Sequence, residues 1–400
     1  MLRGLTTFFV LLLQLGTTAP AAATGNYDPS AYRVTRPGEI LFDRAARAEL
    51  LAGLPPERRR AWCGSATESW RSHKAKTKLK TPADADLQTD ERSEPFAWTI
   101  MTAAAAAFGR GDPHAREALT GNLRRWARGK ALTKLEDRHE NTYYSLERTL
   151  LPTIVAYGLV RSDPDWDRVE RKQVERWLNR LVRLRGIKRP DETKGPISLM
   201  NNHRYLSDSV DMAWGALRGN DALFREGIES FLLALDQMRP DGSLPLETER
   251  GAKALWYQRQ AVASLVTIAE IAAVQGYDLY AMTIEGKSLH RAIDFLARAI
   301  AEPDLVLPYA RANEKPGEFA NYLVQDRSFM RRRGHDRHYM AWFEAYRVRF
   351  PERDGTRLLT RLLGEFEAES RPMVDDFSGG NMSCFFALSD EAPGERAPQW

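Results

Sequence analysis

The chain has 400 residues, of which 43% are hydrophobic and 28% charged, so it can build a large core in one domain or two. Its net charge of +4 is small for this length and argues against a nucleic-acid-binding protein, which would concentrate basic residues on one face. A basic cleft for an acidic ligand remains compatible with this total, because the local field matters more than the sum.

The first 23 residues have the pattern of a secretory signal peptide. A positive start at Met1–Arg3 precedes an apolar run from Thr6 to Leu15, and Ala21–Ala23 supplies small residues for cleavage. The apolar run is too short for a membrane anchor, which needs roughly 20 residues. We therefore expect residues 24–400 to form a single exported domain, periplasmic or secreted, with no membrane segment after cleavage.

The sequence has only two cysteines and no clear spacing of metal ligands. Cys63 and Cys384 stand near opposite ends of the chain, and in an oxidising compartment they can pair. The alternative is two separate thiols, because the sequence does not establish that their Cα atoms come close enough. His335 and His338 are three residues apart, but no further ligand spacing supports a zinc site, so no metal is predicted.

The part of the chain that follows the signal peptide predicts two helices and then an exposed loop. Helical spacing covers residues 40–52 and again residues 55–70. Residues 72–93 are polar and show no clear period, which is typical of an exposed, mobile loop. Its lysines, including Lys76 and Lys78, form either a solvated surface or a basic lid that folds over an anionic polymer.

From residue 95 onward the pattern predicts helix after helix, with almost no strand signals. Most of these helices pair across short polar turns, and no fixed repeat of sequence is evident. They are expected at residues 96–108, 113–128, 141–160, 166–184, 205–217, 221–238, 250–274, 288–300, 335–350 and 355–368. Helical hairpins in a ring make a toroid with a groove at one end, so we expect an all-α toroid. The polar segment 387–400 is expected to be disordered.

The first candidate site is the polar run Asn201, Asn202 and His203. Asparagine amides can donate hydrogen bonds to a carboxylate, and histidine is easily poised for proton transfer near neutral pH. On spacing alone, the favoured interpretation is a helix cap at one of the asparagines with the histidine in the first turn.

A second polar stretch follows about fifty residues later, after a tight turn at Pro240–Gly242. Glu247 falls at a predicted helix start, where a negative charge suits the helix dipole. Arg250 and Tyr257 are seven residues apart, which places them on one face of the expected helix 250–274. Arginine can neutralise a carboxylate, and tyrosine can act as an acid or, ionised, as a base. The alternative is a surface arginine and a packed aromatic ring.

These two stretches together resemble the alginate lyase family of polysaccharide lyases. The resemblance covers approximately residues 141–300 and rests on Asn-Asn-His followed by Leu-Pro-x-Glu, an arginine and a tyrosine. It implies an incomplete (α/α) toroid that cuts an anionic uronic-acid polymer such as alginate or polymannuronate by β-elimination, without a metal or other cofactor. Carried over residue by residue, it makes Asn202, His203, Arg250 and Tyr257 the catalytic residues.

Three positions depart from the family's pattern. Gln260 stands where the best-known members have a second tyrosine, and Tyr205 and Leu206 stand where they tend to have a tryptophan. Phe377 and Ser378 occupy the place of an arginine that often precedes the C-terminal Gly-Gly. These changes concern the sugar that is recognised more than the type of reaction.

The resemblance implies a division of roles among the catalytic residues. Asn202 and Arg250 neutralise the uronate carboxylate, so that charge can develop as an enolate-like anion when the C5 proton leaves. If the proton and the leaving oxygen O4 lie on one face of the sugar, Tyr257 can serve both in turn. If they lie on opposite faces, His203 is the base and Tyr257 the acid. The sequence leaves both routes open.

Further residues are predicted to contact the polymer. Asn201 and Glu247 belong to the two stretches themselves. Tyr143, Tyr144 and Arg148 can line the groove, where aromatic rings stack on sugars, although packing between helices is the other role for at least one tyrosine.

Two other functions remain open at this stage. A glycoside hydrolase on a similar toroid needs two carboxylates across the groove, about 6.5–9.5 Å apart if it inverts. The available candidates are Asp208, Asp211, Glu247 and Glu249. The second alternative is a non-catalytic protein that binds glycans in the periplasm.

Overall fold

The computed structural model describes residues 27–64, 94–134, 140–186, 196–317, 319–333, 336–366 and 371–388. Several predictions fall on other parts of the chain and stay predictions. These are the signal peptide at residues 1–23, the loop at 72–93 with Lys76 and Lys78, and the predicted disordered tail 387–400 apart from its first two residues. Ala387 is buried and its N–H donates to Ser383 O at 3.0 Å, so the prediction of disorder is wrong for this residue.

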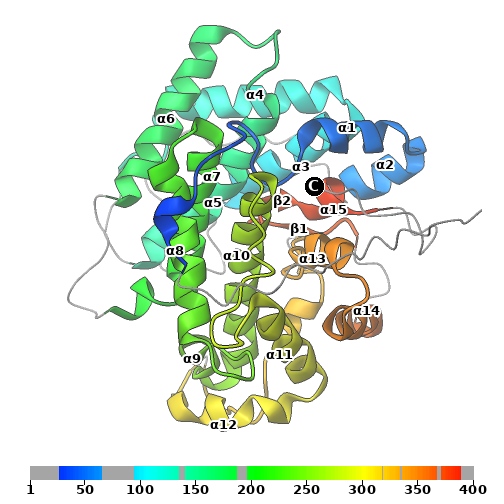
Figure 1. Ribbon diagram of the computed structural model, residues 1–400. Coiled ribbons are helices and arrows are strands. Elements are labelled where there is room, and N and C mark those ends of the chain that lie inside the picture. Colours follow the sequence, from blue (N-terminus) through cyan, green and yellow to red (C-terminus); the bar gives the residue numbers. More distant parts are fainter. Residues whose placement is uncertain are drawn as a thin grey trace, which may run out of the picture.

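Helices dominate the described residues (Figure 1). The α-helices are α1 (Arg44–Ala52), α2 (Pro56–Cys63), α3 (Glu94–Arg110), α4 (Pro113–Arg128), α5 (Glu140–Val160), α6 (Arg168–Gly186), α7 (Asn202–Arg218), α8 (Asp221–Gln237), α9 (Pro245–Thr248), α10 (Ala254–Val274), α11 (Leu289–Ala301), α12 (Leu307–Ala310), α13 (Phe343–Arg349), α14 (Asp354–Phe366) and α15 (Met382–Phe386).

Short 3-10 helices and one small sheet complete the described structure. The 3-10 helices are η1 (Pro29–Ala31), η4 (Pro196–Leu199), η5 (Gly251–Lys253), η6 (Pro303–Leu305), η7 (Arg311–Asn313) and η8 (Ser328–Met330). The strands are β1 (Val374–Asp375) and β2 (Gly380–Asn381), which pair antiparallel.

The long helices form two layers, as the toroid prediction requires. Helices α3, α5, α7 and α10 pack against one another in that order and make the inner layer. Helices α4, α6, α8 and α11 follow them in the chain and cover them from outside. Helix α10 is buried around almost its whole circumference, as expected of a core helix. The predicted all-α toroid is confirmed. Among the described residues, no helix is long and apolar enough to cross a membrane.

The hairpin of α7 and α8 shows how local sequence sets this arrangement. Gly219 ends α7 in the left-handed conformation (φ 69°), and the side chain of Asn220 caps α8 by accepting a hydrogen bond from Leu223 N at 3.2 Å. Gly215 lets the two helices approach closely, because a Cβ there would lie 2.5 Å from Phe224 N. The hairpin therefore brings the start of α7 to one end of the toroid.

Several predicted helices are shorter in the structure, among them the first one, which begins at Arg44 and not at residue 40. Helix α2 ends at Cys63 and does not continue to residue 70, because Gly64 is extended (φ −88°, ψ −172°). Helix α13 begins at Phe343 and not at residue 335, because the chain before it turns through Asp336, whose φ is +68°. The sequence between 336 and 342 is instead held by the C-terminal segment, since His338 N donates to Val374 O at 3.0 Å.

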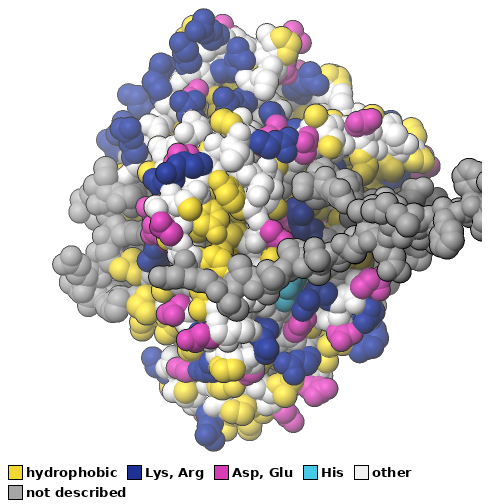
Figure 2. Space-filling view, in the orientation of Figure 1, with side chains coloured by type: hydrophobic (Ala, Val, Ile, Leu, Met, Phe, Trp, Pro, Cys, Tyr) yellow, Lys and Arg dark blue, Asp and Glu magenta, His cyan; other side chains and the backbone are white. Residues whose placement is uncertain are grey.

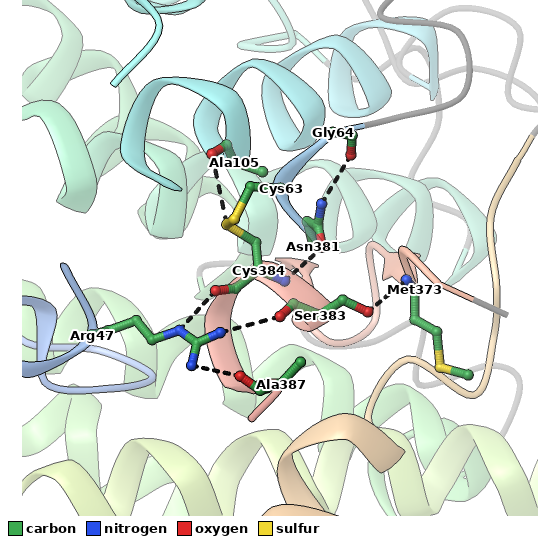
Figure 3. Close-up of a disulfide and its surroundings, with 9 residues drawn as sticks. All are labelled: Arg47, Cys63, Gly64, Ala105, Met373, Asn381, Ser383, Cys384 and Ala387. Carbon is green, nitrogen blue, oxygen red and sulfur yellow. Dashed lines mark hydrogen bonds between the residues drawn. A yellow bond between two sulfur atoms is a disulfide. The ribbon is translucent and has the colours of Figure 1, made fainter. Parts of the chain in front are cut away.

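The C-terminal segment, residues 371–388, returns to the inner helices. Its strand β2 packs on α3 and α5, and α15 packs on α2. Cys384 of α15 forms a disulfide with Cys63 at the end of α2, so the two cysteines pair (Figure 3). Gly109 of α3 leaves room for the bridge, because a Cβ at that position would overlap both sulfurs.

Polar contacts around the disulfide fix α15 at both ends (Figure 3). Asn381 caps its start, accepting from Cys384 N at 2.9 Å. Arg47 donates to the carbonyls of Cys384 and Ala387 at 2.8 Å each, which satisfies acceptors that a helix end leaves open. The segment is thus held firmly enough to carry side chains into the interior of the toroid.

Candidate active site

The start of α7 places the first polar run. Asn201 is extended and caps the helix, because its side-chain oxygen accepts from His203 N at 3.0 Å. The capping interpretation is therefore correct for Asn201. The same cap sets Asn202 as the first helical residue, fully buried, and His203 in the first turn, only partly buried. A cap and a functional site thus share these residues.

Asn202 is held by a buried carboxylate from the second stretch. Its backbone N–H donates to Glu247 Oε1 at 2.6 Å, and its amide Nδ2 donates to Glu247 Oε2 at 2.8 Å. Burial raises the pKa of Glu247, although the charge of Arg250 and the bonds from Asn202 act in the opposite direction. Glu247, predicted to contact substrate, lies behind Asn202 and fixes its orientation.

Tyr144 of α5 completes this arrangement. Its hydroxyl donates to Asn202 Oδ1 at 3.3 Å, and its ring lies against the His203 ring, with centroids 4.3 Å apart. Burial raises the pKa of Tyr144 well above its ordinary value, so it acts as a neutral donor. The structure therefore places Tyr144 in the packed interior and not on an open wall of the groove.

Arg250 and Tyr257 meet, but not for the predicted reason. The expected helix 250–274 begins only at Ala254, because Gly251 has φ +49° and lies so close to Phe319 O that a Cβ would collide with it. Arg250 therefore precedes the helix and donates through Nε to Leu246 O at 2.8 Å. Its guanidinium carbon still lies 4.2 Å from the centroid of the Tyr257 ring.

These side chains surround a pocket of about 560 Å³. Its lining residues are Ile197, Ser198, Asn201, His203, Leu246, Glu249, Arg250, Ala312, Asn313 and Phe319. Tyr257 lies beside this pocket, since its ring contacts both Arg250 and Phe319. The two polar stretches of the sequence therefore meet at one pocket, built from η4, the start of α7, the α9 region and η7.

A cluster of buried charges lies inside the toroid near Tyr144. Asp376 accepts from Arg148 Nε at 2.9 Å and lies 3.0 Å from Arg337 NH1. Burial opposes its ionisation, but the two guanidinium groups lower the pKa of Asp376 to about 2. The neighbouring Asp375 has its pKa raised well above the ordinary value by burial and by the charge of Asp376. Arg148, predicted to contact polymer, is thus engaged with the C-terminal segment.

Arg259 belongs to the same cluster. It is fully buried on α10, and its guanidinium carbon lies 4.8 Å from the ring of Tyr339 and 5.4 Å from the ring of Phe377. Its charge partly offsets the raised pKa of Asp375. Sequence reasoning missed this residue. The signal was the single arginine in the largely apolar helix 254–274.

Two of the four carboxylates considered for a glycoside hydrolase, Asp208 and Glu247, are engaged away from the pocket. Asp208 is buried and accepts from Arg204 at 3.0 Å and from Ser230 at 2.5 Å. Glu247 binds Asn202, as described above. Glu249 lines the pocket but pairs with Arg239 at 2.5 Å. Within the described part of the chain, no group of three or more potential metal ligands gathers.

With this geometry in place, comparison with known proteins identifies the family. The sequence profile of the family described as alginate lyase matches residues 57–306, which is more than half of the chain. The chain belongs to the alginate lyase family. The family resemblance seen in the sequence is therefore confirmed.

Relatives within the alginate lyase family match about three fifths of the chain. A polysaccharide lyase of Stenotrophomonas maltophilia (strain K279a) is 30% identical over 242 residues, covering 60% of this chain and 65% of that protein. An alginate lyase of Pseudomonas syringae pv. syringae (strain B728a) is 27% identical over 241 residues, covering 59% of this chain and 58% of that protein. The chain thus spans less than two thirds of the length of these relatives.

Solved structures of alginate lyases share the fold. A tyrosine-to-phenylalanine variant of alginate lyase A1-III from Sphingomonas species A1, complexed with a tetrasaccharide, matches with a TM-score of 0.75 at 24% identity, covering 92% of this chain and 100% of that one. An alginate lyase from Bacteroides ovatus matches with a TM-score of 0.55 at 15% identity, covering 86% and 92%. At these identities the likeness concerns the fold.

Proposed function

We propose that this protein is a polysaccharide lyase that cleaves an anionic uronic-acid polymer of the alginate type by β-elimination. The observation that carries the proposal is the convergence of His203, Arg250 and Tyr257 at one pocket, with Asn202 held behind it. Family membership supports it, and relatives carry the names polysaccharide lyase and alginate lyase. The alginate lyase A1-III was captured with a tetrasaccharide in variants that replace a tyrosine or a histidine.

The first requirement of the reaction is to neutralise the carboxylate next to C5. Arg250 lines the pocket and brings a positive charge to it. Asn202 has two N–H groups on Nδ2, and one of them is used by Glu247, so the other is the donor for the uronate. Together they stabilise the enolate-like anion that forms as the C5 proton departs.

The second requirement is proton transfer. A base removes the C5 proton, the C4–O4 bond breaks as the C4–C5 double bond forms, and an acid protonates the departing O4. Tyr257 serves both steps if the C5 proton and the departing O4 lie on one face of the sugar. If the C5 proton and O4 lie on opposite faces, His203 is the base and Tyr257 is the acid. Contact with Tyr144 restrains the His203 ring for the second route.

Export is a further part of the proposal. Residues 1–23 act as a signal peptide, and residues 24–400 work as one lyase domain in the periplasm or outside the cell. An anionic polysaccharide is the partner, and neither nucleic acid nor a metal takes part. The disulfide between Cys63 and Cys384 supports an oxidising compartment.

The test is a panel of uronic-acid polymers, including polymannuronate-rich alginate and glucuronan. Cleavage by β-elimination creates a C4–C5 double bond, so we expect new ultraviolet absorbance with at least one polymer. His203→Ala should abolish it. No new absorbance on any polymer would rule out a lyase, and reducing ends without absorbance would favour a hydrolase. Retained binding with unchanged polymer length would indicate a glycan-binding protein.

Glu247 has a predicted effect of its own as a positioning residue. Glu247→Gln can accept only one of the two Asn202 N–H groups and turns its own amide toward the other. We expect kcat to fall about 10–100-fold, because small displacements of a binding group are costly, with little change in the unfolding midpoint. Glu229→Gln is the control, since Glu229 is half exposed on α8. Equal kcat in the two variants would contradict this role.

A further inference from the structure

One face of α6 carries a row of exposed basic side chains. Its members are Arg168, Lys172, Arg176, Arg180 and Arg183, which we call the basic stripe. Their spacing of three or four residues places them on one side of the helix, along roughly 22 Å of its axis. Dark-blue side chains gather over α6 at the upper left of Figure 2.

The charge of α6 is out of proportion to that of the whole protein. Residues 168–186 contain seven basic and two acidic side chains, a net charge of +5, whereas the entire chain has +4. Both acidic residues form ion pairs with arginines of other helices. Glu170 pairs with Arg124 and Arg128 of α4, and Glu175 pairs with Arg218 of α7.

The basic stripe itself forms no ion pair with any residue in the described part of the chain. Other exposed arginines behave differently: on α14, Arg357 pairs with Asp354, and Arg361 with Glu365. Like charges three or four residues apart destabilise a helix, and ordinary surfaces mix both signs. An unpaired row of five cations is therefore costly for the fold and calls for a polyanionic partner.

The position of the stripe connects it with the pocket. Helices α5 and α6 are consecutive and antiparallel, and the start of α5 carries Tyr144, which binds Asn202 beside the pocket. The end of α6 with Arg183 therefore lies at the pocket end of the toroid. The chain after α6 returns in η4, whose Ile197 lines the pocket.

We propose that the basic stripe is a second, non-catalytic binding surface for the anionic polysaccharide. The proposal rests on the proposed function, because it takes the polymer cleaved in the pocket as the partner. Successive carboxylates along one chain meet the successive cations, so a long polymer is held at two places and a short oligosaccharide only at the pocket. Held near the pocket, the polymer has a raised local concentration there.

The test measures binding without turnover, in the full chain carrying His203→Ala. In the stripe variant all five residues of the basic stripe become glutamine, which keeps helix propensity. The matched control neutralises five exposed arginines elsewhere, namely Arg33, Arg60, Arg298, Arg357 and Arg361. The probes are long polymannuronate, its tetrasaccharide, duplex DNA and vesicles of anionic lipid.

We expect the stripe variant to bind long polymannuronate at least about tenfold more weakly than the control at low salt, with a shallower salt dependence, because fewer counterions are released. Tetrasaccharide binding should be equal in both. Equal polymer binding would overturn the proposal, as would stripe-dependent binding of DNA or vesicles but not of polymannuronate. If the stripe variant does not fold, Arg176→Gln/Arg180→Gln is compared in the same way.

The outcomes separate this proposal from the proposed function. If the unsubstituted protein cleaves no polymer on the panel, the lyase function fails, whereas stripe-dependent binding of polymannuronate can still be measured. If the unsubstituted protein cleaves polymer and the stripe variant binds long polymannuronate as tightly as the control does, the lyase function stands and the second binding surface is refuted.

Discussion

Replacing Tyr257 with phenylalanine is expected to lower kcat on the uronate polymer by about a thousandfold, with the fold intact. The change removes only the hydroxyl, and a positioned proton donor or acceptor contributes roughly 10²–10⁴-fold. The ring keeps its contacts with Arg250 and Phe319. Tyr144 cannot take over, because its hydroxyl is bound to Asn202 and burial raises its pKa well above the ordinary value.

The measurement is kcat and KM from the appearance of ultraviolet absorbance. Because the carboxylate-binding groups remain, KM should change far less than kcat. Tyr277→Phe is the matched control: the Tyr277 hydroxyl accepts from Arg33 N at 3.0 Å, and its ring packs on Tyr32 of the N-terminal segment. This control should stay within about twofold of the unsubstituted enzyme. A Tyr257→Phe variant with more than a tenth of the original kcat would show that the hydroxyl carries no proton.

The parts of the structure that sequence predicted well depend on neighbours in the chain. Helix α4 begins at Pro113 and ends at Arg128, as expected, because Asp112 caps it by accepting from His114 N at 3.0 Å. Asn201 caps α7 for the same kind of reason. The approach of the two polar stretches was predicted through the family resemblance, since no local rule brings residues fifty apart together.

The parts that sequence missed depend on distant contacts. The break before α10 requires Phe319 to lie against Gly251. The charged cluster joins Arg148, Arg337 and Asp376, which come from three separate regions of the chain. Ion pairs between distant segments leave no periodic pattern in the sequence. The only sign of this region in the sequence was the departure from the family pattern at Phe377 and Ser378, before Gly379–Gly380.

Net charge was also an incomplete guide. The total of +4 argued against a concentrated basic face, yet α6 alone carries +5 and the remaining residues are nearly balanced. A sum over 400 residues hides such a row. The helical spacing from Arg168 to Arg183 reveals it, because residues three or four apart share one face.

The buried aspartates predict opposite effects for two substitutions that change the same atoms. Asp376→Asn removes a carboxylate that pairs with both Arg148 and Arg337, which are buried. Breaking a buried ion pair in this way costs about 3–5 kcal/mol, because uncompensated charges remain inside. Asp375→Asn removes a carboxyl whose pKa burial already raises well above the ordinary value. It should therefore be neutral or stabilising.

Both substitutions also predict how stability depends on pH. The pKa of Asp376 is lowered to about 2, so its stabilising effect is complete above the ordinary carboxyl pKa and is lost only as pH falls through about 2. Asp376→Asn also removes the charge that raises the pKa of Asp375, so it relieves part of the cost of Asp375, and its penalty should be smaller at pH 8 than at pH 5. Asp375 holds its proton in the folded state at pH values where the unfolded chain has released it, so its presence lowers stability as pH rises.

Urea unfolding of both variants and of the unsubstituted protein at pH 5 and pH 8 measures these effects. We expect Asp376→Asn to be less stable than the unsubstituted protein at both pH values, with the smaller penalty at pH 8, and the stability of Asp375→Asn relative to the unsubstituted protein to increase from pH 5 to pH 8. The disulfide is intact in all three proteins, so the reference state is shared. Equal destabilisation by Asp375→Asn and Asp376→Asn would contradict the prediction. It would mean that both carboxylates are ionised in the folded protein and that Arg259 neutralises Asp375.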